Sequence, residues 1–333
     1  MIEILKPGLL SSVQDLGRIG YQKYGVIVSG VMDHLAHRLA NVIVGNPEEV
    51  PTLEFTLLGP QLLFKEDALI AICGGDLSPT INGKHVRTWR AIYVKKGSEL
   101  SFGPCRSGCR AYLAVAGGFD IPKVMGSAST YIRAGIGGFE GRALQAGDEL
   151  PFGVPSRQST HIISELRNRI GTREWVESDW SLNLDLVPKI EETTTIRVIE
   201  GREIALFDED SIGKFFSETF LITPQSDRMG YRLNGPQLKM TSEAELISEA
   251  VNFGTIQIPA GGQPIILLAD RQTMGGYPKI AQVISTDFHK VAQLKPGDKI
   301  KFEKVSLEKA QKSFLERETY IKQLKMAIAL RTN

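Results

Sequence analysis

The feature that most constrains the fold is a series of short apolar segments, rich in β-branched residues, that glycine, proline and asparagine interrupt. The segments follow one another at intervals of about ten residues, a spacing typical of β-sandwiches and β-barrels. We predict strands at residues 68–73, 91–94, 110–116, 195–199, 245–249, 255–258 and 265–269. The 33 glycines in 333 residues fit a chain with many tight turns. The sequence therefore predicts a mainly β protein with a few short helices.

Two short motifs recur in the two halves of the chain and indicate an internal duplication. GPQL occurs at 59–62 and again at 235–238, and a Gly-Asp pair precedes a predicted strand at 147–148 and at 297–298. The chain is also too long for one ordinary core, so we predict two related β-barrels in tandem. The predicted boundaries are 1–155 for the first barrel, 156–195 for a connecting segment, 196–303 for the second barrel and 304–333 for a C-terminal helix.

Helical patterning is sparse and is clearest in two places. Apolar residues recur at helical spacing between residues 32 and 44, with Ser29 or Asp33 as the N-cap and a Gly-Asn-Pro run as the end. The second predicted helix covers about residues 307–330. Its apolar stripe consists of Phe314, Ile321, Leu324 and Ile328.

The charge balance excludes several classes of function. The 39 basic and 38 acidic residues leave a formal net charge of +1, which gives no electrostatic footprint for nucleic acid or an anionic membrane. No uncharged apolar run approaches the ~18 residues of a membrane span, and the N-terminus does not resemble a signal peptide. Cys73, Cys105 and Cys109 are expected to be plain thiols in a reducing compartment. We therefore expect a cytoplasmic protein.

One segment in the C-terminal half concentrates polar side chains at the mouth of a predicted buried strand. The strand ends in Asp270, Arg271 and Gln272, and a turn that contains Tyr277 then leads to Lys279. A plain hairpin needs only turn residues here, and each additional charge near a core costs desolvation unless it is paired. We interpret the segment as a site for an anionic or carbonyl-bearing ligand. The alternative is a buried Asp–Arg pair that holds a loop in place.

The order Asp, Arg, Gly, Tyr occurs in two further places. Asp15, Arg18 and Tyr21 belong to the first copy, and Asp227 and Arg228 begin the second. An arginine can hold a carboxylate or phosphate bidentately, and an aspartate can orient that arginine or act as a general base. We therefore predict that these residues contact substrate. The alternative is a turn clasp that is repeated because the domains are duplicated.

Ser29 begins the segment SGVMD that opens the first predicted helix, and it is a further candidate for contacting substrate. The N–H groups of a helix N-terminus can seat an anion, whereas capping alone is the alternative. His34 and His37 lie beside Asp33, but no third strong ligand is spaced to complete a set. We predict no metal site and interpret both histidines as exposed. The chain has no P-loop, so nucleotide binding would need another device.

Five long motifs occur in a fixed order along the chain. They are SVQDLGRIGY at 12–21, SGVMD at 29–33, ANVIVGN at 40–46, SDRMGYRL at 226–233 and LLADRQTMGGYPKI at 267–280. With these motifs the chain resembles the allophanate hydrolase subunit 2-like family, whose members are also called biotin-dependent carboxyltransferase-like proteins. The resemblance covers residues 2 to about 303 and implies that the tandem barrels are cyclophilin-like.

Within that family, a stand-alone chain of this length resembles one of the subunits of bacterial 5-oxoprolinase. The resemblance implies opening of 5-oxo-L-proline to L-glutamate with ATP as co-substrate and Mg²⁺ accompanying it. The work would be done in a complex with the A and B subunits of the enzyme, of which the B subunit is Kip-inhibitor-like. One alternative is a regulatory protein that antagonises a Kip-type inhibitor of a sporulation sensor histidine kinase. Another is a component of a biotin-dependent carboxyltransferase, although QLKM at 237–240 and 323–326 does not predict self-biotinylation.

The implied reaction suggests a role for each candidate residue. Phosphorylation of a lactam needs cations for the phosphates and the developing oxyanion, and a base for the attacking water. We predict that Asp270 is the base, that Arg271 and Lys279 are catalytic cations, and that Gln272 and Tyr277 hold the lactam. The further cations would be Arg228 and Arg18, and the alternative bases Asp227 and Asp15.

Overall fold

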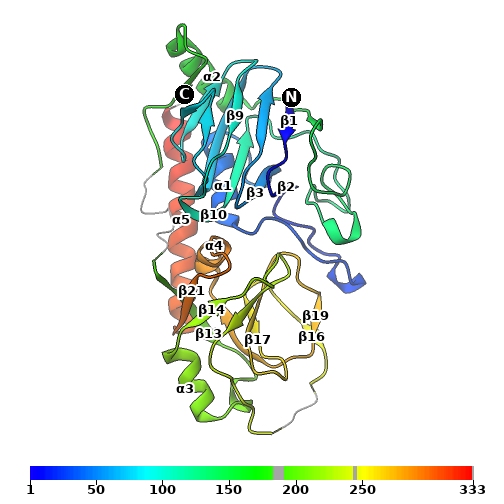
Figure 1. The fold of residues 1–333 in the computed structure, drawn as a ribbon. Coiled ribbons are helices and arrows are strands. Elements are labelled where there is room, and N and C mark those ends of the chain that lie inside the picture. Colours follow the sequence, from blue (N-terminus) through cyan, green and yellow to red (C-terminus); the bar gives the residue numbers. More distant parts are fainter. Residues whose placement is uncertain (183–190, 243–245, 332–333) are drawn as a thin grey trace. The chain divides into compact units, whose positions relative to one another are not determined.

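The computed structural model describes residues 1–182, 191–242 and 246–331 (Figure 1). Its backbone contacts divide the chain into two units. Unit 1 comprises Met1–Gly17, Asp33–Pro188 and Tyr320–Asn333, and unit 2 comprises Arg18–Met32 and Lys189–Thr319. A short segment of the N-terminal half, Arg18–Met32, is therefore grouped with the C-terminal unit.

Unit 1 contains two six-stranded sheets. The first, in the order β11-β1-β4-β9-β6-β7, consists of β11 (Glu149–Leu150), β1 (Ile2–Lys6), β4 (Gln61–Phe64), β9 (Glu99–Ser101), β6 (Thr80–Ile81) and β7 (Lys84–His85). The second, in the order β12-β8-β5-β10-β3-β2, consists of β12 (Trp175–Glu177), β8 (Ala91–Val94), β5 (Ala68–Asp76), β10 (Ser107–Val115), β3 (Thr52–Thr56) and β2 (Leu10–Gln14). Helix α1 (His34–Ile43) contacts β5 and β10, and α2 (Arg157–Ile170) contacts β8 and β12. A 3₁₀ turn, η2, covers Ile132–Ala134.

The two central strands of the second sheet are buried along almost their whole length. All residues of β5 except the last, and all residues of β10 except the first, are buried. Such strands are covered on both faces, which explains why they are largely apolar rather than alternating. Gly74 of β5 has φ +100°, and a Cβ there would lie 2.4 Å from the carbonyl oxygen of Arg110. This position therefore requires glycine for both its backbone conformation and its close approach.

Unit 2 contains a closed barrel in the order β13-β20-β17-β18-β15-β14-β21 (Figure 1). Its strands are β13 (Thr193–Glu200), β20 (Lys279–Val283), β17 (Thr255–Gln257), β18 (Ile265–Leu267), β15 (Gly230–Asn234), β14 (Phe220–Ile222) and β21 (Lys299–Lys304). A small sheet pairs β16 (Glu249–Ala250) with β19 (Met274–Gly275). The helical elements are α3 (Glu209–Ser217), α4 (Phe288–Ala292), the start of α5 (Leu307–Arg331), η1 (Gln22–Tyr24), η4 (Ile204–Leu206) and η5 (Ser285–Asp287). The predicted mainly β fold is confirmed.

Alternating strands and clustered phenylalanines form the core of the barrel. Along β13, buried and partly exposed positions alternate, which places Ile196 and Val198 inside. Ile196 lies opposite Phe302 of β21 in parallel register. The ring of Phe302 stacks on that of Phe215 of α3, with centroids 4.5 Å apart. Helix α3 thereby covers this part of the barrel, and the offset aromatic contact adds to the area that is buried.

The Gly-Asp motif forms the same turn in each unit. The carboxylate of Asp148 accepts a hydrogen bond from the backbone N–H three residues earlier at 2.7 Å, and that of Asp298 does the same at 3.0 Å. The carbonyl of Asp148 accepts from the N–H of Ile4 in β1, and that of Asp298 accepts from the N–H of Ile222 in β14. This correspondence supports a duplication. GPQL does not share it, because its first copy runs into β4, whereas its second follows β15 and lies in no strand.

Both predicted helices are present, and their ends follow the sequence signals. Helix α1 is capped by Asp33, whose carboxylate accepts from the N–H of Ala36 at 2.9 Å, so Asp33 rather than Ser29 is the cap. Helix α5 buries Ile321 and Ile328 of its predicted stripe, whereas Phe314 stays 41% exposed. The interpretation of both α1 histidines as exposed is wrong. The helix places His37 on its buried face with Nδ1 2.9 Å from Thr52 Oγ1, and His34 is only partly exposed.

The predicted connecting segment contains regular structure. Residues 157–170 form α2, which buries Ile162, Leu166 and Ile170. These residues recur every four positions, a helical pattern that the surrounding Ser, Arg and Glu residues obscure. The strand predicted at 245–249 begins outside the described residues, and β16 contains only its last position. In the described part of the chain, no helix combines the length and the apolar character that crossing a membrane requires.

Candidate functional site

Three of the predicted site residues come together within unit 2. Arg228 donates from Nε to Asp270 Oδ2 at 3.0 Å and from Nη2 to Oδ1 at 3.2 Å. The hydroxyl of Ser29 donates to Asp270 Oδ1 at 2.7 Å. All three side chains are buried, with 3–7% of their surface exposed. The Asp270 carboxylate is thus held on both oxygens, and the guanidinium of Arg228 also donates to the carbonyl of Gly30.

The pairing of two barrel strands explains why Arg228 and Asp270 meet. Strands β15 and β18 are antiparallel neighbours, with Gly230 opposite Leu267. Arg228 lies shortly before β15 and Asp270 shortly after β18, so both residues lie at the same end of the strand pair. The ladder continues into the loops, because the Asp270 N–H donates to the Arg228 carbonyl at 2.8 Å. The repeated Asp-Arg motifs of the sequence therefore cross-pair here, the arginine coming from one copy and the aspartate from another.

Ser29 reaches this cluster through a strained backbone. Its φ is +56°, in the left-handed region that non-glycine residues rarely occupy, and Gly30 follows with φ +92°. Such a conformation costs roughly 1–2 kcal/mol for an ordinary residue. Strained residues cluster at functional sites, where the surrounding structure holds them in place. The strain directs the Ser29 hydroxyl toward Asp270, and this makes Ser29 a stronger candidate than its position before a helix suggested.

Arg271 follows Asp270 in sequence but makes different contacts. Its Nη1 donates to the carbonyl of Leu268 at 3.1 Å, and its Nε donates to the carbonyl of Val251 at 3.3 Å. Burial lowers the pKa of Arg271 to about 10, and the nearby charge of Asp270 opposes this effect only in part. The side chain remains cationic at neutral pH and lines a cavity of unit 2.

Lys279, predicted as a catalytic cation, lies between two carboxylates in the structure. Its Nζ is 3.4 Å from Glu249 and 3.7 Å from Glu203. Its backbone N–H also donates to Glu203 at 3.1 Å. An anionic ligand would have to compete with both glutamates for this ammonium group.

The remaining predicted residues of unit 2 do not join the buried cluster. Tyr277 is 50% exposed, and Gln272 is partly exposed. Asp227 is exposed, and its carboxylate accepts from the N–H of Met229 at 2.8 Å, which closes an Asx-turn. Its geometry favours the turn-clasp interpretation. Arg18 is fully buried in unit 2, and Tyr21 precedes the short turn η1.

Asp15 belongs to unit 1 and is buried in a local network. Its Oδ1 accepts from the N–H of Gly17 at 2.8 Å and from the hydroxyls of Ser127 and Ser129. Its Oδ2 accepts from the N–H of Ala128 at 2.6 Å. A carboxylate that receives four hydrogen bonds from its own unit fastens two loops together. This arrangement favours a structural role for Asp15.

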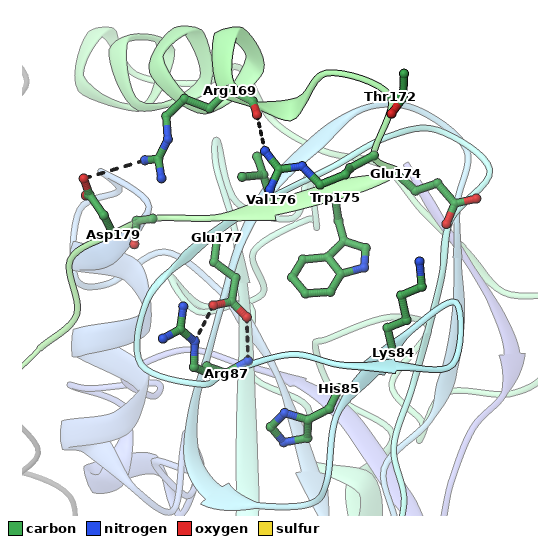
Figure 2. Close-up of a pocket in the computed structure, with 12 residues that line it drawn as sticks. Lys84, His85, Arg87, Arg169, Thr172, Glu174, Trp175, Val176, Glu177 and Asp179 are labelled. Carbon is green, nitrogen blue, oxygen red and sulfur yellow. Dashed lines mark hydrogen bonds and ion pairs between the residues drawn. The ribbon is translucent and has the colours of Figure 1, made fainter.

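A second cavity, of about 980 Å³, lies in unit 1 and was not predicted from the sequence (Figure 2). The indole of Trp175 occupies its centre, with Lys84 and His85 on the facing segment. Several of its charges are balanced within the wall, since Arg87 donates to Glu177 at 2.6 Å and Arg169 lies 3.9 Å from Asp179. Arg169, Trp175, Glu177 and Asp179 fall in the predicted connecting segment, and Arg87 follows the exposed β6–β7 hairpin. Neither segment contained a motif that would predict a cavity.

The sequence matches a known family over most of its length. The family model of the carboxyltransferase domain, subdomains A and B, matches residues 24–304. The chain therefore belongs to this carboxyltransferase domain family.

Individual relatives include the C subunits of two bacterial 5-oxoprolinases and a yeast urea amidolyase. The chain is 38% identical to the C subunit of 5-oxoprolinase from Escherichia coli over 97% of both chains, and 38% identical to that from Haemophilus influenzae over 98% and 99%. It is also 36% identical to urea amidolyase of Saccharomyces cerevisiae, over 97% of this chain but 18% of that protein.

Solved structures of similar proteins agree with membership of the carboxyltransferase domain family. The crystal structure of the K. lactis urea amidolyase matches with a TM-score of 0.86 at 34% identity, over 97% of this chain. The chain spans only 20% of the length of that enzyme. The crystal structure of TTHA0988 matches with a TM-score of 0.75 at 30% identity, over 91% of this chain and 55% of that one.

Proposed function

We propose that this chain is the C subunit of a cytoplasmic, ATP-dependent 5-oxoprolinase complex that opens 5-oxo-L-proline to L-glutamate. The observation that carries the proposal is the end-to-end similarity to the C subunit of the Escherichia coli enzyme, at 38% identity over 97% of both chains. A match that leaves almost no part of either chain uncovered supports the same role in the complex. The A subunit and the Kip-inhibitor-like B subunit would be the partners.

The chemistry to be explained is the opening of a resonance-stabilised amide. Transfer of the ATP γ-phosphoryl group to the lactam oxygen would release ADP and weaken that resonance. Water could then add to the ring carbon, the ring C–N bond could break, and hydrolysis would release phosphate. Such a sequence needs cations for the phosphates, with Mg²⁺ accompanying ATP, and a base for the water.

The buried cluster supports Asp270 as that base. Arg228 contacts both of its oxygens, so the carboxylate is held in one orientation at the end of the barrel strands. In this proposal Ser29 would contact the substrate, because its hydroxyl donates to the base Asp270. Arg271 would be a cation for the developing oxyanion, and Tyr277 and Gln272 would lie at the exposed side. Lys279 would serve only after exchange of its glutamate partners.

The decisive experiment measures ATP-dependent glutamate release from 5-oxoproline. It compares this chain alone, the A and B subunits without it, and the full set. We expect release only from the full set, and its loss with Asp270→Asn. Asp227→Asn is the matched control, because that carboxylate is exposed and closes an Asx-turn outside the buried cluster. Release from the two partners alone would refute an obligatory role, and full activity of Asp270→Asn would remove its assignment as base.

A second candidate function is carboxyl transfer from a biotin-borne carboxyl group. It is supported by the carboxyltransferase family model and by the TM-score of 0.86 to the urea amidolyase structure. The discriminating measurement is ATP-dependent incorporation of labelled bicarbonate into a biotin-bearing partner and onward to an acceptor. Tight binding of a Kip-inhibitor-like protein with no activity in any mixture would instead favour the regulatory alternative.

A further inference from the structure

A cavity of about 780 Å³ in unit 2 lies between barrel strands and the first turns of α5. Its volume is within the ~300–1,000 Å³ of pockets that hold drug-sized ligands. Most of its wall is apolar and consists of Ile199, Phe253, Val283, Ile284, Phe288, Leu307, Ala310, Phe314 and Leu315. The polar part consists of Asn252, Gln282, Ser285, Gln311 and Arg271. Among these lining residues, Arg271 is the one that carries a charge.

Among the residues that the structure describes, none forms an ion pair with Arg271. Two of its nitrogens donate to backbone carbonyls, those of Val251 and Leu268. Within the described residues, no carboxylate oxygen lies within 4.0 Å of its guanidinium, since the neighbouring Asp270 pairs with Arg228 instead. By contrast, Arg197, elsewhere in the same unit, is paired with the fully buried Asp287. Arg271 is therefore a largely desolvated cation that faces an apolar space.

This arrangement costs free energy that a bound anion would recover. Burial of a charge is unfavourable unless the charge is paired, and the lowered pKa of Arg271 reports that cost. A guanidinium matches the planar carboxylate group in a bidentate geometry. A single cation in apolar surroundings balances one negative charge, whereas a phosphate monoester carries nearly two. The site therefore favours one carboxylate over a phosphate.

We propose that this cavity binds an amphipathic monocarboxylate. Its carboxylate pairs with Arg271, and its apolar body packs against Phe253, Phe288 and Phe314. The ligand class is distinct from the substrate proposed above, because the small, polar ring of 5-oxoproline would leave most of the apolar wall uncovered. The proposal rests on the cavity and its single charge, and it stands whether or not the chain belongs to a 5-oxoprolinase. If it does, a monocarboxylate bound to Arg271 would compete with the oxyanion role proposed for that residue above.

The test is isothermal titration calorimetry of the full chain with octanoate, and with octan-1-ol as the neutral probe of the same length. We expect saturable binding of one octanoate per chain, and about tenfold weaker binding of octan-1-ol. Arg271→Gln should lower the affinity for octanoate about tenfold and leave that for octan-1-ol unchanged. Lys312→Gln is the matched control, because it removes one positive charge from an exposed α5 position outside the cavity wall.

A second variant keeps the test valid if Arg271→Gln fails to fold. Gln311→Glu is nearly isosteric, lies on the exposed face of α5 and adds a negative charge to the cavity wall. It should weaken octanoate binding several-fold without affecting octan-1-ol. Equal affinities of wild type for the two probes, non-saturable binding, or unchanged octanoate affinity in both variants would each overturn the proposal.

Discussion

Arg228 and Asp270 form a buried, two-point ion pair, with Nε 3.0 Å from Oδ2 and Nη2 3.2 Å from Oδ1. The two residues lie 42 positions apart and meet because β15 and β18 are neighbours in the barrel. The carboxylate also accepts from Ser29, which unit 2 receives from the N-terminal half of the chain. This pair therefore combines candidate chemistry with the fastening of two loops to the barrel.

Removal of one partner of the pair should destabilise the protein strongly. Arg228→Met leaves the Asp270 charge buried without its partner, and such a change costs about 3–5 kcal/mol. Arg228→Lys should recover only part of that loss, because an ammonium group cannot contact both oxygens in the same fork geometry. Urea unfolding measures the free energy. An Arg228→Met variant as stable as wild type would show that the pair does not hold the loops.

Two substitutions of Ser29 separate strain from hydrogen bonding. Ser29→Ala loses the bond to Asp270 and retains the positive φ, so it should cost about 1–2 kcal/mol. Ser29→Gly loses the same bond but relieves roughly 1 kcal/mol of strain, so it should be the more stable of the two variants. Both should impair the activity of the complex equally if the hydroxyl contacts substrate. Thermal unfolding gives the stability order, and the reverse order would refute the strain.

We expect substitution of Asp15 to affect stability and substitution of Asp270 to affect catalysis. Asp15→Asn disturbs a carboxylate with four hydrogen bonds in unit 1 and should lower stability by about 1–3 kcal/mol. Its kcat, measured in the full complex at a temperature where the variant is folded, should stay near wild type. Asp270→Asn should instead lower kcat. Equal losses of kcat in the two variants would argue against a special role for Asp270.

The buried His37 should make the protein sensitive to acid. Burial, with a contribution from His34, lowers the pKa of His37 from 6.5 to about 3. The unfolded chain therefore binds more protons than the folded chain between these values, and stability falls as the pH drops from 6.5 toward 3. The shift corresponds to roughly 2–5 kcal/mol at full effect.

The measurement is the free energy of unfolding as a function of pH for wild type and His37→Gln. The slope between pH 6.5 and 4.5 should be shallower in His37→Gln, which has no imidazole to protonate. His161→Gln is the control, since His161 is exposed on α2. Parallel curves for wild type and His37→Gln would exclude the histidine as the source of acid sensitivity.

Local sequence patterns predicted helices and strands well where a single clear signal marked the element. The apolar run at 91–94 forms β8 with those bounds, and the Asp33 cap and the Gly-Asn-Pro stop bracket α1. The segment 156–195 was predicted as a connecting segment without regular structure, because the polar residues of α2 conceal an apolar repeat that includes Ile162 and Leu166. Short-range periodicity reveals an element only when its buried face stands out from its composition.

The sequence by itself determined that the chain is mainly β, that it carries a duplicated turn, and that Asp270, Arg271 and their neighbours form an unusual polar segment. The tertiary structure alone decided which arginine pairs with Asp270. Adjacent Arg271 would be the choice from sequence, but strand pairing brings Arg228 to the carboxylate and leaves Arg271 facing an apolar cavity. Contacts between residues far apart in sequence depend on register and on barrel closure, which no local pattern encodes.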